Sequence, residues 1–299
     1  MIEPRSDERL DWVGAIPFAL LHLSVLLVFW TGASLVAVAG CLASYLIRMF
    51  GITAGYHRYF SHRSYQTGRA FQLTLALLGA SSAQMGPLWW AAHHRHHHAY
   101  SDTDEDVHSP GLRGFFWAHI GWFLCRRHAH TNYHRVRDLT RFPELVLLDR
   151  LPLLAPVAYA VFWFLLGVAL EPVPALGTDR WQMFVWGFLV STVLLYHGTF
   201  CINSLCHVIG TRRFETRDDS RNNLWLALIT LGEGWHNNHH RFPSSERQGF
   251  YPHEIDLTHA GLALLSRWGV VWGLREPPES VLREGQEGRT LTRTPLTTT

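Results

Sequence analysis

Histidine is the residue whose number and spacing stand out in this sequence. The chain has 20 histidines, and most of them lie in a few short clusters. In the cluster His236-Asn-Asn-His239-His240, the i, i+3 and i+4 spacing would place three imidazoles on one face of a helix. Neutral imidazole is a good ligand for iron, copper, nickel and zinc. This cluster therefore predicts a metal site.

A second cluster, between residues 93 and 98, contains the same spacing twice. The spacing leaves two registers open, His94/His97/His98 and His93/His96/His97. Two copies of one ligand pattern in a single chain are improbable by chance. The second cluster therefore supports metal binding without fixing which three rings take part.

Two further candidates carry weaker signals. His57 and His62 are five residues apart, and five residues rotate by about 140° on an α-helix. Taken alone they would be two solvent-facing histidines, unless the helix ends or bends near Ser61. Asn203 and His207 lie one helical turn apart, and a single histidine there is more often a helix-end hydrogen-bonding residue.

The number of candidate ligands indicates the kind of site. Eight or nine histidines exceed what one metal can bind, whereas two metals with four or five ligands each can use them. A structural zinc site would be closed by four ligands, usually including cysteine. The clusters therefore predict a binuclear site with room for an exogenous ligand.

Long apolar stretches must position these clusters. Apolar residues make up 47% of the chain and charged residues 17%, against about 25% charged in an ordinary soluble domain. Four stretches reach about the ~20 residues that cross a bilayer, at residues 12–30, 33–50, 151–170 and 181–202. The sequence predicts an all-α integral membrane protein with four transmembrane helices in two hairpins.

The distribution of arginine orients these helices. The chain has no lysine, and its net charge of +2 forms no nucleic-acid footprint. The two hairpin loops carry only Arg180, so the positive-inside tendency places both termini and a helical cap with the histidine clusters on the cytoplasmic side. We expect residues 1–275 to form one domain. Residues 276–299, rich in Pro, Thr, Arg and Glu, are predicted to be disordered.

The clusters with their flanks resemble the three histidine boxes of membrane fatty-acid desaturases, most closely the acyl-CoA (stearoyl-CoA type) Δ9 desaturases. The boxes read Gly51-Ile-Thr-Ala-Gly-Tyr-His57-Arg-Tyr-Phe-Ser-His62, His94-Arg95-His96-His97-His98 and Gly232-Glu-Gly-Trp-His236-Asn-Asn-His239-His240. The resemblance covers roughly residues 20–274 and favours the first register. It implies a ligand set of His57, His62, His94, His97, His98, His207, His236, His239 and His240, with Asn203 acting through a water.

The resemblance also implies the chemistry. Two irons would use O2 to convert a saturated acyl chain to a cis-monounsaturated one, with electrons from a separate carrier such as ferredoxin, rubredoxin or cytochrome b5 with its reductase. Asp104, Asp106 and Glu233 are candidates to orient ligating imidazoles. Arg126 and Arg127 match a basic pair near the family's CoA-contacting surface, and anchoring at lipid headgroups is an equal alternative.

The first hairpin is expected to form the closed end of an acyl tunnel. Cys41 and Tyr45 lie on nearly one helix face before His57, and a bulky Tyr45 there would favour C16 over C18 chains. A lipid hydroxylase or alkane monooxygenase is the alternative among enzymes. A metal transporter or sensor is remote, because the spans offer only His22 and His197 at membrane depth.

Overall fold

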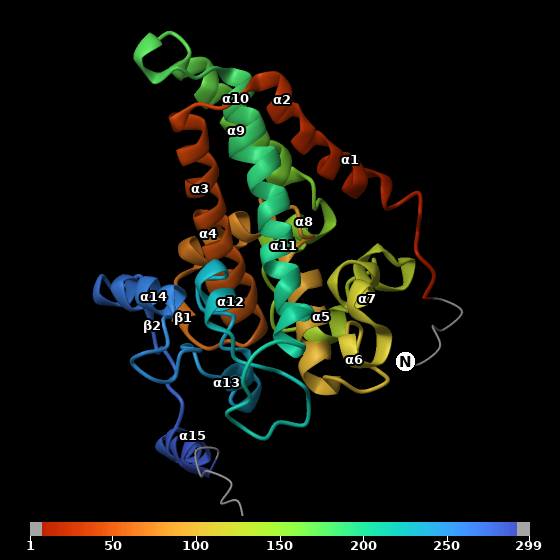
Figure 1. The fold of residues 1–299 in the computed structure, drawn as a ribbon, viewed down its shortest axis with the longest axis vertical. Helices are drawn as coiled ribbons and strands as arrows, with labels where there is room; N and C mark the ends of the chain where they lie inside the picture. The colour runs from red at the N-terminus through yellow and green to blue at the C-terminus, as the bar shows by residue number, and fades with distance from the viewer. Residues whose placement is uncertain (1–7, 292–299) are drawn as a thin grey trace, which may run out of the picture.

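The computed structural model describes residues 8–291, which are mostly helical (Figure 1). The α-helices are α1 (Ile16–Ser24), α2 (Val28–Thr31), α3 (Leu35–Phe50), α4 (Arg69–Ala80), α5 (Pro87–Tyr100), α6 (Pro110–Arg113), α7 (Phe115–His119), α8 (Pro143–Arg150), α9 (Leu154–Leu170), α10 (Arg180–Phe184), α11 (Ser191–Asn203), α12 (Leu224–Ile229), α13 (His236–Arg241), α14 (Leu257–Arg267) and α15 (Glu279–Leu291). Two stretches, Gly51–Ser61 and Val185–Val190, are π-helical. Strands β1 (Gln66–Thr67) and β2 (Val271–Trp272) pair antiparallel, with Gln66 opposite Trp272.

Two helices are long and apolar enough to cross a bilayer. Leu35–Ser61 joins α3 to the first π-helical stretch over 27 residues, and Arg180–His207 runs from α10 past α11 over 28 residues. At about 1.5 Å per residue both exceed the ~30 Å thickness of the hydrocarbon core. They contain the predicted spans 33–50 and 181–202 and extend them toward the histidine clusters.

The other two predicted spans are not single helices of full length. The apolar helix near the N-terminus covers only Ile16–Thr31, because the chain turns from Trp12 to Ala15 and Gly32, at φ +66°, ends the helix. Helices α8 and α9 meet at 79°, and the break contains Pro152, which cannot donate a helical hydrogen bond. Within residues 8–291 there are two candidate spans, or three if the bent pair is one, so four are not confirmed.

Small residues let the apolar helices pack closely around one indole. A Cβ atom at Gly187 would lie 2.3 Å from the ring of Trp163, and one at Gly40 would lie 2.9 Å from the same ring. Glycine at a helix contact allows the backbones to approach within the bilayer. The contact therefore joins α3, α9 and the second long helix into one bundle.

The histidine-bearing elements gather at one end of this bundle. In Figure 1, α5, α12 and α13 lie beside the lower ends of α3 and α11. The π-helical stretch Gly51–Ser61 packs against α4 and α5. Clusters that are far apart in the sequence therefore meet at the ends of the two long helices.

The C-terminal residues form a helix where the composition predicts disorder. Helix α15 covers Glu279–Leu291, and its Val281 is buried against Phe214, Phe250 and Tyr251. Leu282 packs in the same pocket and Glu284 pairs with Arg241, so this helix has tertiary contacts that its composition does not reveal. Residues 292–299, also predicted to be disordered, lie outside the described residues.

Candidate metal centre

The first histidine pair is brought together by the π-helical stretch Gly51–Ser61. A π-helix closes hydrogen bonds between residues five apart, and the amide of His62 donates to the carbonyl of His57 at 3.2 Å. Residues at this spacing therefore lie one turn apart, instead of rotated by the ~140° of an α-helix. The two Nε2 atoms approach to 3.1 Å. The widened helix explains a spacing that looked unfavourable in the sequence.

Five imidazoles converge on one point, which we call group A. They belong to His57, His62, His94, His98 and His239, and their ring nitrogens all lie within 4.8 Å of one another. The Nε2 atoms of His62 and His94 are 2.8 Å apart. Those of His98 and His239 are 2.9 Å apart. Group A therefore joins the π-helical stretch, α5 and α13.

A second set of four imidazoles forms group B. It consists of His97, His207, His236 and His240, with the same 4.8 Å limit. The Nε2 atoms of His207 and His236 are 3.1 Å apart. Helix α5 serves both groups, because His94 and His98 face group A while His97 faces group B.

The structure also places the rings left open by the spacing. His93 Nδ1 lies 2.9 Å from the carbonyl oxygen of Trp89. His96 Nε2 lies 2.9 Å from the carbonyl oxygen of Glu105. Both rings belong to neither group, so the register that reaches the centre is the one that the resemblance favours.

Carboxylates hold four of the nine imidazoles by their outer nitrogen. The Nδ1 contacts are His97 with Asp106 at 3.0 Å, His207 with Asp102 at 3.0 Å, His240 with Asp218 at 2.7 Å and His57 with Glu233 at 2.5 Å. A carboxylate in this position fixes the ring tautomer and its orientation. Each ring then keeps Nε2 unprotonated, with its lone pair directed into the group.

The sequence named three such carboxylates, and two are in place. Asp106 and Glu233 are buried, whereas Asp104 is exposed and does not meet the expectation of a buried partner. Asp102 takes that place because the turn after α5 directs it toward His207. Asp218 lies 22 residues before its partner in an irregular loop, where no sequence pattern marks it.

Six of the nine rings have a lowered pKa, which favours their neutral form, whereas the carboxylate of Asp106 raises the pKa of His97 although burial opposes it. Burial, reinforced by neighbouring histidines, lowers the pKa of His62, His94, His98, His236, His239 and His240, the last to about 4. Although burial opposes it, the hydrogen bond with His240 holds the pKa of Asp218 below its ordinary value. Neutral imidazoles and ionised carboxylates are the protonation states that metal binding requires.

The spacing of the inner nitrogens fits a metal ion. Metal–nitrogen bonds of about 2.1 Å place neighbouring ligands of an octahedral ion about 3.0 Å apart. The observed Nε2 separations of 2.8 to 3.1 Å agree with this value. The Nε2 atoms of His97 and His240 are buried without a hydrogen-bond partner among the described residues. Converging lone pairs repel one another unless a cation lies between them, so both groups have the chemistry of metal sites.

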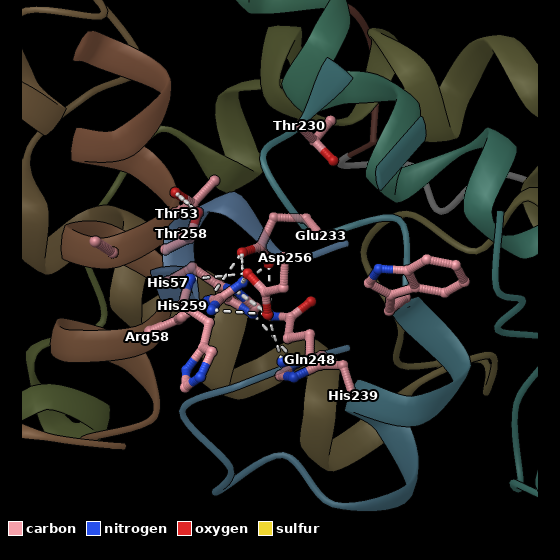
Figure 2. Close-up of polar contacts among 12 residues, drawn as sticks. Thr53, His57, Arg58, Thr230, Glu233, His239, Gln248, Asp256, Thr258 and His259 are labelled. Atoms are coloured by element: carbon pink, nitrogen blue, oxygen red, sulfur yellow. Dashed lines mark hydrogen bonds and ion pairs between the residues drawn. The ribbon is translucent and has the colours of Figure 1, made fainter. Parts of the chain in front are cut away.

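A buried ion network behind group A joins the segment that carries His57 to the segment before His236 (Figure 2). Arg58 is 1% exposed and donates to Glu233 and to Asp256, each at 3.0 Å. Gln248 donates to the other oxygen of Glu233 at 2.7 Å. Breaking a buried ion pair costs about 3–5 kcal/mol. The network therefore fixes Glu233, and through it the ring of His57.

Packing also explains the two glycines, Gly232 and Gly234, that precede His236. Gly232 has φ +127°, and a Cβ there would lie 2.3 Å from Oδ1 of Asp256. A Cβ at Gly234 would lie 2.1 Å from the amide nitrogen of Ala227. Side chains at either position would separate the third cluster from the network around Arg58.

An apolar cavity of about 490 Å³ lies beside group A, since His94 is part of its lining. His108 and Asn203 are also in its lining, and Asn203 is the residue predicted to bind a metal through a water. Leu153 and Val157 also line it and are 69% and 58% exposed. The cavity therefore reaches the apolar outer surface of the bundle near the start of α9.

The residues predicted to close an acyl tunnel lie elsewhere. Neither Cys41 nor Tyr45 lines this cavity. The hydroxyl of Tyr45 donates to the carbonyl of Ile229 at 2.8 Å, and Cys41 packs against Val185 and Leu189. Both side chains face the contact between α3 and the second long helix, so the expected tunnel end does not belong to this cavity.

The predicted basic pair lies at the surface. Arg126 and Arg127 are both exposed, and Arg126 pairs with Asp11 at 2.9 Å. This ion pair ties the segment after α7 to the chain before α1. An exposed position suits a phosphate of either CoA or a lipid headgroup.

Comparison with known proteins agrees with the resemblance seen in the sequence. The family model for fatty acid desaturase matches residues 12–263. An sn-1 stearoyl-lipid 9-desaturase of Anabaena variabilis is 35% identical over 92% of this chain and 97% of its own length. An sn-2 palmitoyl-lipid 9-desaturase of Nostoc sp. (strain 36) is 34% identical over 90% and 91%. A probable acyl-CoA desaturase of Schizosaccharomyces pombe is 32% identical over 93% of this chain and 57% of its own. The chain belongs to the fatty acid desaturase family.

Proposed function

We propose that this protein introduces a cis double bond at the Δ9 position of a saturated fatty acyl chain. One O2 is reduced to two waters, with electrons from a separate one-electron carrier such as ferredoxin, rubredoxin or cytochrome b5. The observation that carries the proposal is a pair of converging imidazole groups, one of which borders an apolar cavity through His94. The groups face the cytoplasm in this proposal, as the arginine distribution favours.

Two irons suit groups A and B. Imidazole is a ligand that iron accepts readily, and the groups offer five and four histidines. Bound iron would supply the O2-dependent oxidation of an unactivated C–H bond, for which no amino-acid side chain is competent. The carboxylates on the outer nitrogens hold the rings in place for it.

The protein itself positions the acyl chain. Trp90 and Phe200 supply apolar walls beside His94, so methylenes can lie next to group A while water is excluded. Gln84 donates to Thr199 at 3.1 Å in the same lining, which fixes the wall between α5 and α11. Holding one carbon pair next to the oxidant accounts for a large part of the rate of such a reaction.

The carrier of the acyl chain has two candidates. A chain esterified to a membrane lipid is supported by the exposed apolar lining at Leu153 and Val157 and by the lipid 9-desaturases among the relatives. A CoA thioester is supported by the exposed pair Arg126 and Arg127 and by the acyl-CoA desaturase relative. We favour the lipid, because the cavity reaches an exposed apolar surface at Leu153 and Val157.

One experiment tests the reaction and the carrier together. Iron-loaded protein in bilayers, with a reduced carrier, is given either stearoyl lipid or stearoyl-CoA, and the products are analysed by mass spectrometry. The proposal expects a Δ9 alkene from the lipid. An alcohol in place of an alkene would favour a hydroxylase, and product from the thioester alone would favour the CoA carrier.

A further inference from the structure

The outer nitrogens of the nine imidazoles differ in what surrounds them. Carboxylates hold four of them, and those of His236 and His239 are buried. The other three belong to His62, His94 and His98, whose rings are half-buried. The hydrogen-bond-length contacts of these three rings with residues 8–291 all use Nε2. Because all three belong to group A, it is group A that can be reached through a ring from outside.

Two of these rings lie outside the cavity lining. His94 is part of the lining, so a bound acyl chain would cover it. His62 and His98 are not part of it, and their ring centroids are 4.6 Å apart. His98 is followed by the exposed Ala99 near the end of α5. We call the outer sides of the His62 and His98 rings the outer edge of group A. A metal held at Nε2 would be one imidazole ring away from this edge.

Arginine residues border the outer edge of group A at His62. Arg63 is the next residue in the chain, and Arg95 donates to the carbonyl of Ser61 on the other side of His62 at 3.0 Å. Arg95 also donates to the carbonyl of Arg135 at 2.8 Å. Arg135 lies in a 3₁₀ turn that packs against α5. Arginines from three separate segments therefore meet beside the ring.

The surface around these residues is strongly positive. The guanidinium of Arg135 lies 5.6 Å from the centre of the Tyr100 ring at the end of α5. Arg137 and Arg141, further along the same segment, are exposed. Asp138 pairs with Arg63 and Arg95. Arginine stays charged at any physiological pH. The set, which we call the arginine patch, has five arginines and one carboxylate, for a net formal charge of +4, and consists of Arg63, Arg95, Arg135, Arg137, Arg141 and Asp138.

A positive surface next to a ligand ring suits a negatively charged redox protein. Complementary charge steers such a partner to the surface and fixes its orientation. The proposed reaction removes two hydrogen atoms from the acyl chain and reduces one O2 to two waters. It therefore requires two further electrons, together with two protons from solvent. A one-electron carrier delivers these electrons in two dockings, each of which oxidises one carrier.

We infer that an acidic one-electron carrier docks on the arginine patch and that its electrons enter group A through the rings of His62 and His98. A carrier on this surface is separated from the group A site by one imidazole ring. The acyl chain occupies the cavity at the same time, beside His94. Electrons and substrate therefore reach group A by different rings. The inference rests on the proposed desaturase function and locates its redox partner.

The first test measures binding of a purified acidic [2Fe–2S] ferredoxin to the protein in bilayers. In the double variant Arg137→Glu/Arg141→Glu, the Kd should rise roughly 10-fold or more at low salt. The difference should shrink at about 0.5 M salt, where charges are screened within a few ångströms. Arg267→Glu/Arg283→Glu, at exposed arginines of α14 and α15, carries the same change in charge and should match the wild type. An equal Kd in the two double variants would overturn the inference.

The second test locates the docked carrier without turnover. Diethyl pyrocarbonate modifies accessible, unprotonated histidine nitrogens, and mass spectrometry identifies the modified residues. In iron-loaded protein we expect modification of His62 and His98, and bound ferredoxin should protect both. The exposed His130 should stay reactive in either case. Equal modification of His62 and His98 with and without saturating ferredoxin would overturn the inference. Failure to modify them without ferredoxin would overturn it as well, because the outer edge would then be inaccessible.

The third test uses steady-state kinetics with ferredoxin as the electron donor. A docking surface predicts that Arg137→Glu/Arg141→Glu raises the KM for ferredoxin roughly 10-fold, while kcat changes much less. A loss confined to kcat would contradict docking at this surface. If the wild type makes no alkene, the proposed function fails, while the binding and modification experiments still decide on the arginine patch.

Discussion

If groups A and B hold the two irons of the proposed function, replacing Asp218 by asparagine should weaken iron binding in group B and leave group A intact. The side chain of Asp218 is 8% exposed and contacts His240 Nδ1 at 2.7 Å. Asparagine has nearly the same shape and can still accept the hydrogen bond, so the substitution removes the charge and little else. A neutral acceptor makes the imidazole a poorer electron donor to the metal.

The expected loss of metal affinity follows from the contact between Asp218 and the outer nitrogen, Nδ1, of His240. Loss of such a partner costs about 10- to 100-fold in metal affinity, which is roughly 1.4–2.8 kcal/mol at ~1.4 kcal/mol per factor of ten. Because groups A and B share no ring, the loss should fall on one of two irons. Asp219→Asn is the matched control. The carboxylate of Asp219 is next in the chain, but it is 57% exposed and pairs with Arg212 at 3.5 Å.

The assay is a competition between the protein and an iron chelator, read as iron bound per chain. In Asp218→Asn one iron should leave at a 10- to 100-fold lower chelator concentration, while the other follows the wild type. Circular dichroism of the metal-free variants checks that both are folded. Wild-type retention of both irons in a folded Asp218→Asn protein would refute the argument that this carboxylate tunes group B.

Three further predictions follow from the site. Asp102→Asn should weaken group B as Asp218→Asn does, whereas Asp104→Asn should not, and iron analysis of the pair checks this. The metal-free protein should lose stability as the pH falls from about 6.5 toward 4, because folded pKa values such as that of His240 lie below the unfolded value. Each such imidazole contributes up to about 1.4 kcal/mol per pH unit. An unchanged melting temperature between pH 7 and pH 5 would contradict this prediction. Ala160→Phe, in the cavity lining, should shift products toward shorter chains, whereas Tyr45→Phe should leave chain length unchanged by gas chromatography.

The number of membrane helices shows a limit of reading composition along the chain. Apolar length identified all four stretches, but it did not reveal the break at Pro152 or the late start of the first helix. A hydropathy average is insensitive to where a helix bends. In the same way, a polar tail composition did not reveal that Val281 anchors α15 in an aromatic pocket.

The sequence by itself predicted which histidines come together, because metal-binding spacing within a helix is local and can be recognised in the sequence; the structure brings these nine histidines into groups A and B. The sequence also determined the apolar setting and the family. Only the tertiary structure decided how the nine imidazoles divide into five and four, which depends on how distant helices converge. It alone supplied Asp102 and Asp218, because a partner carboxylate needs only to be near in space. It also showed why His57 and His62 work together, since a π-helix forms only when its surroundings stabilise a backbone that local propensity disfavours.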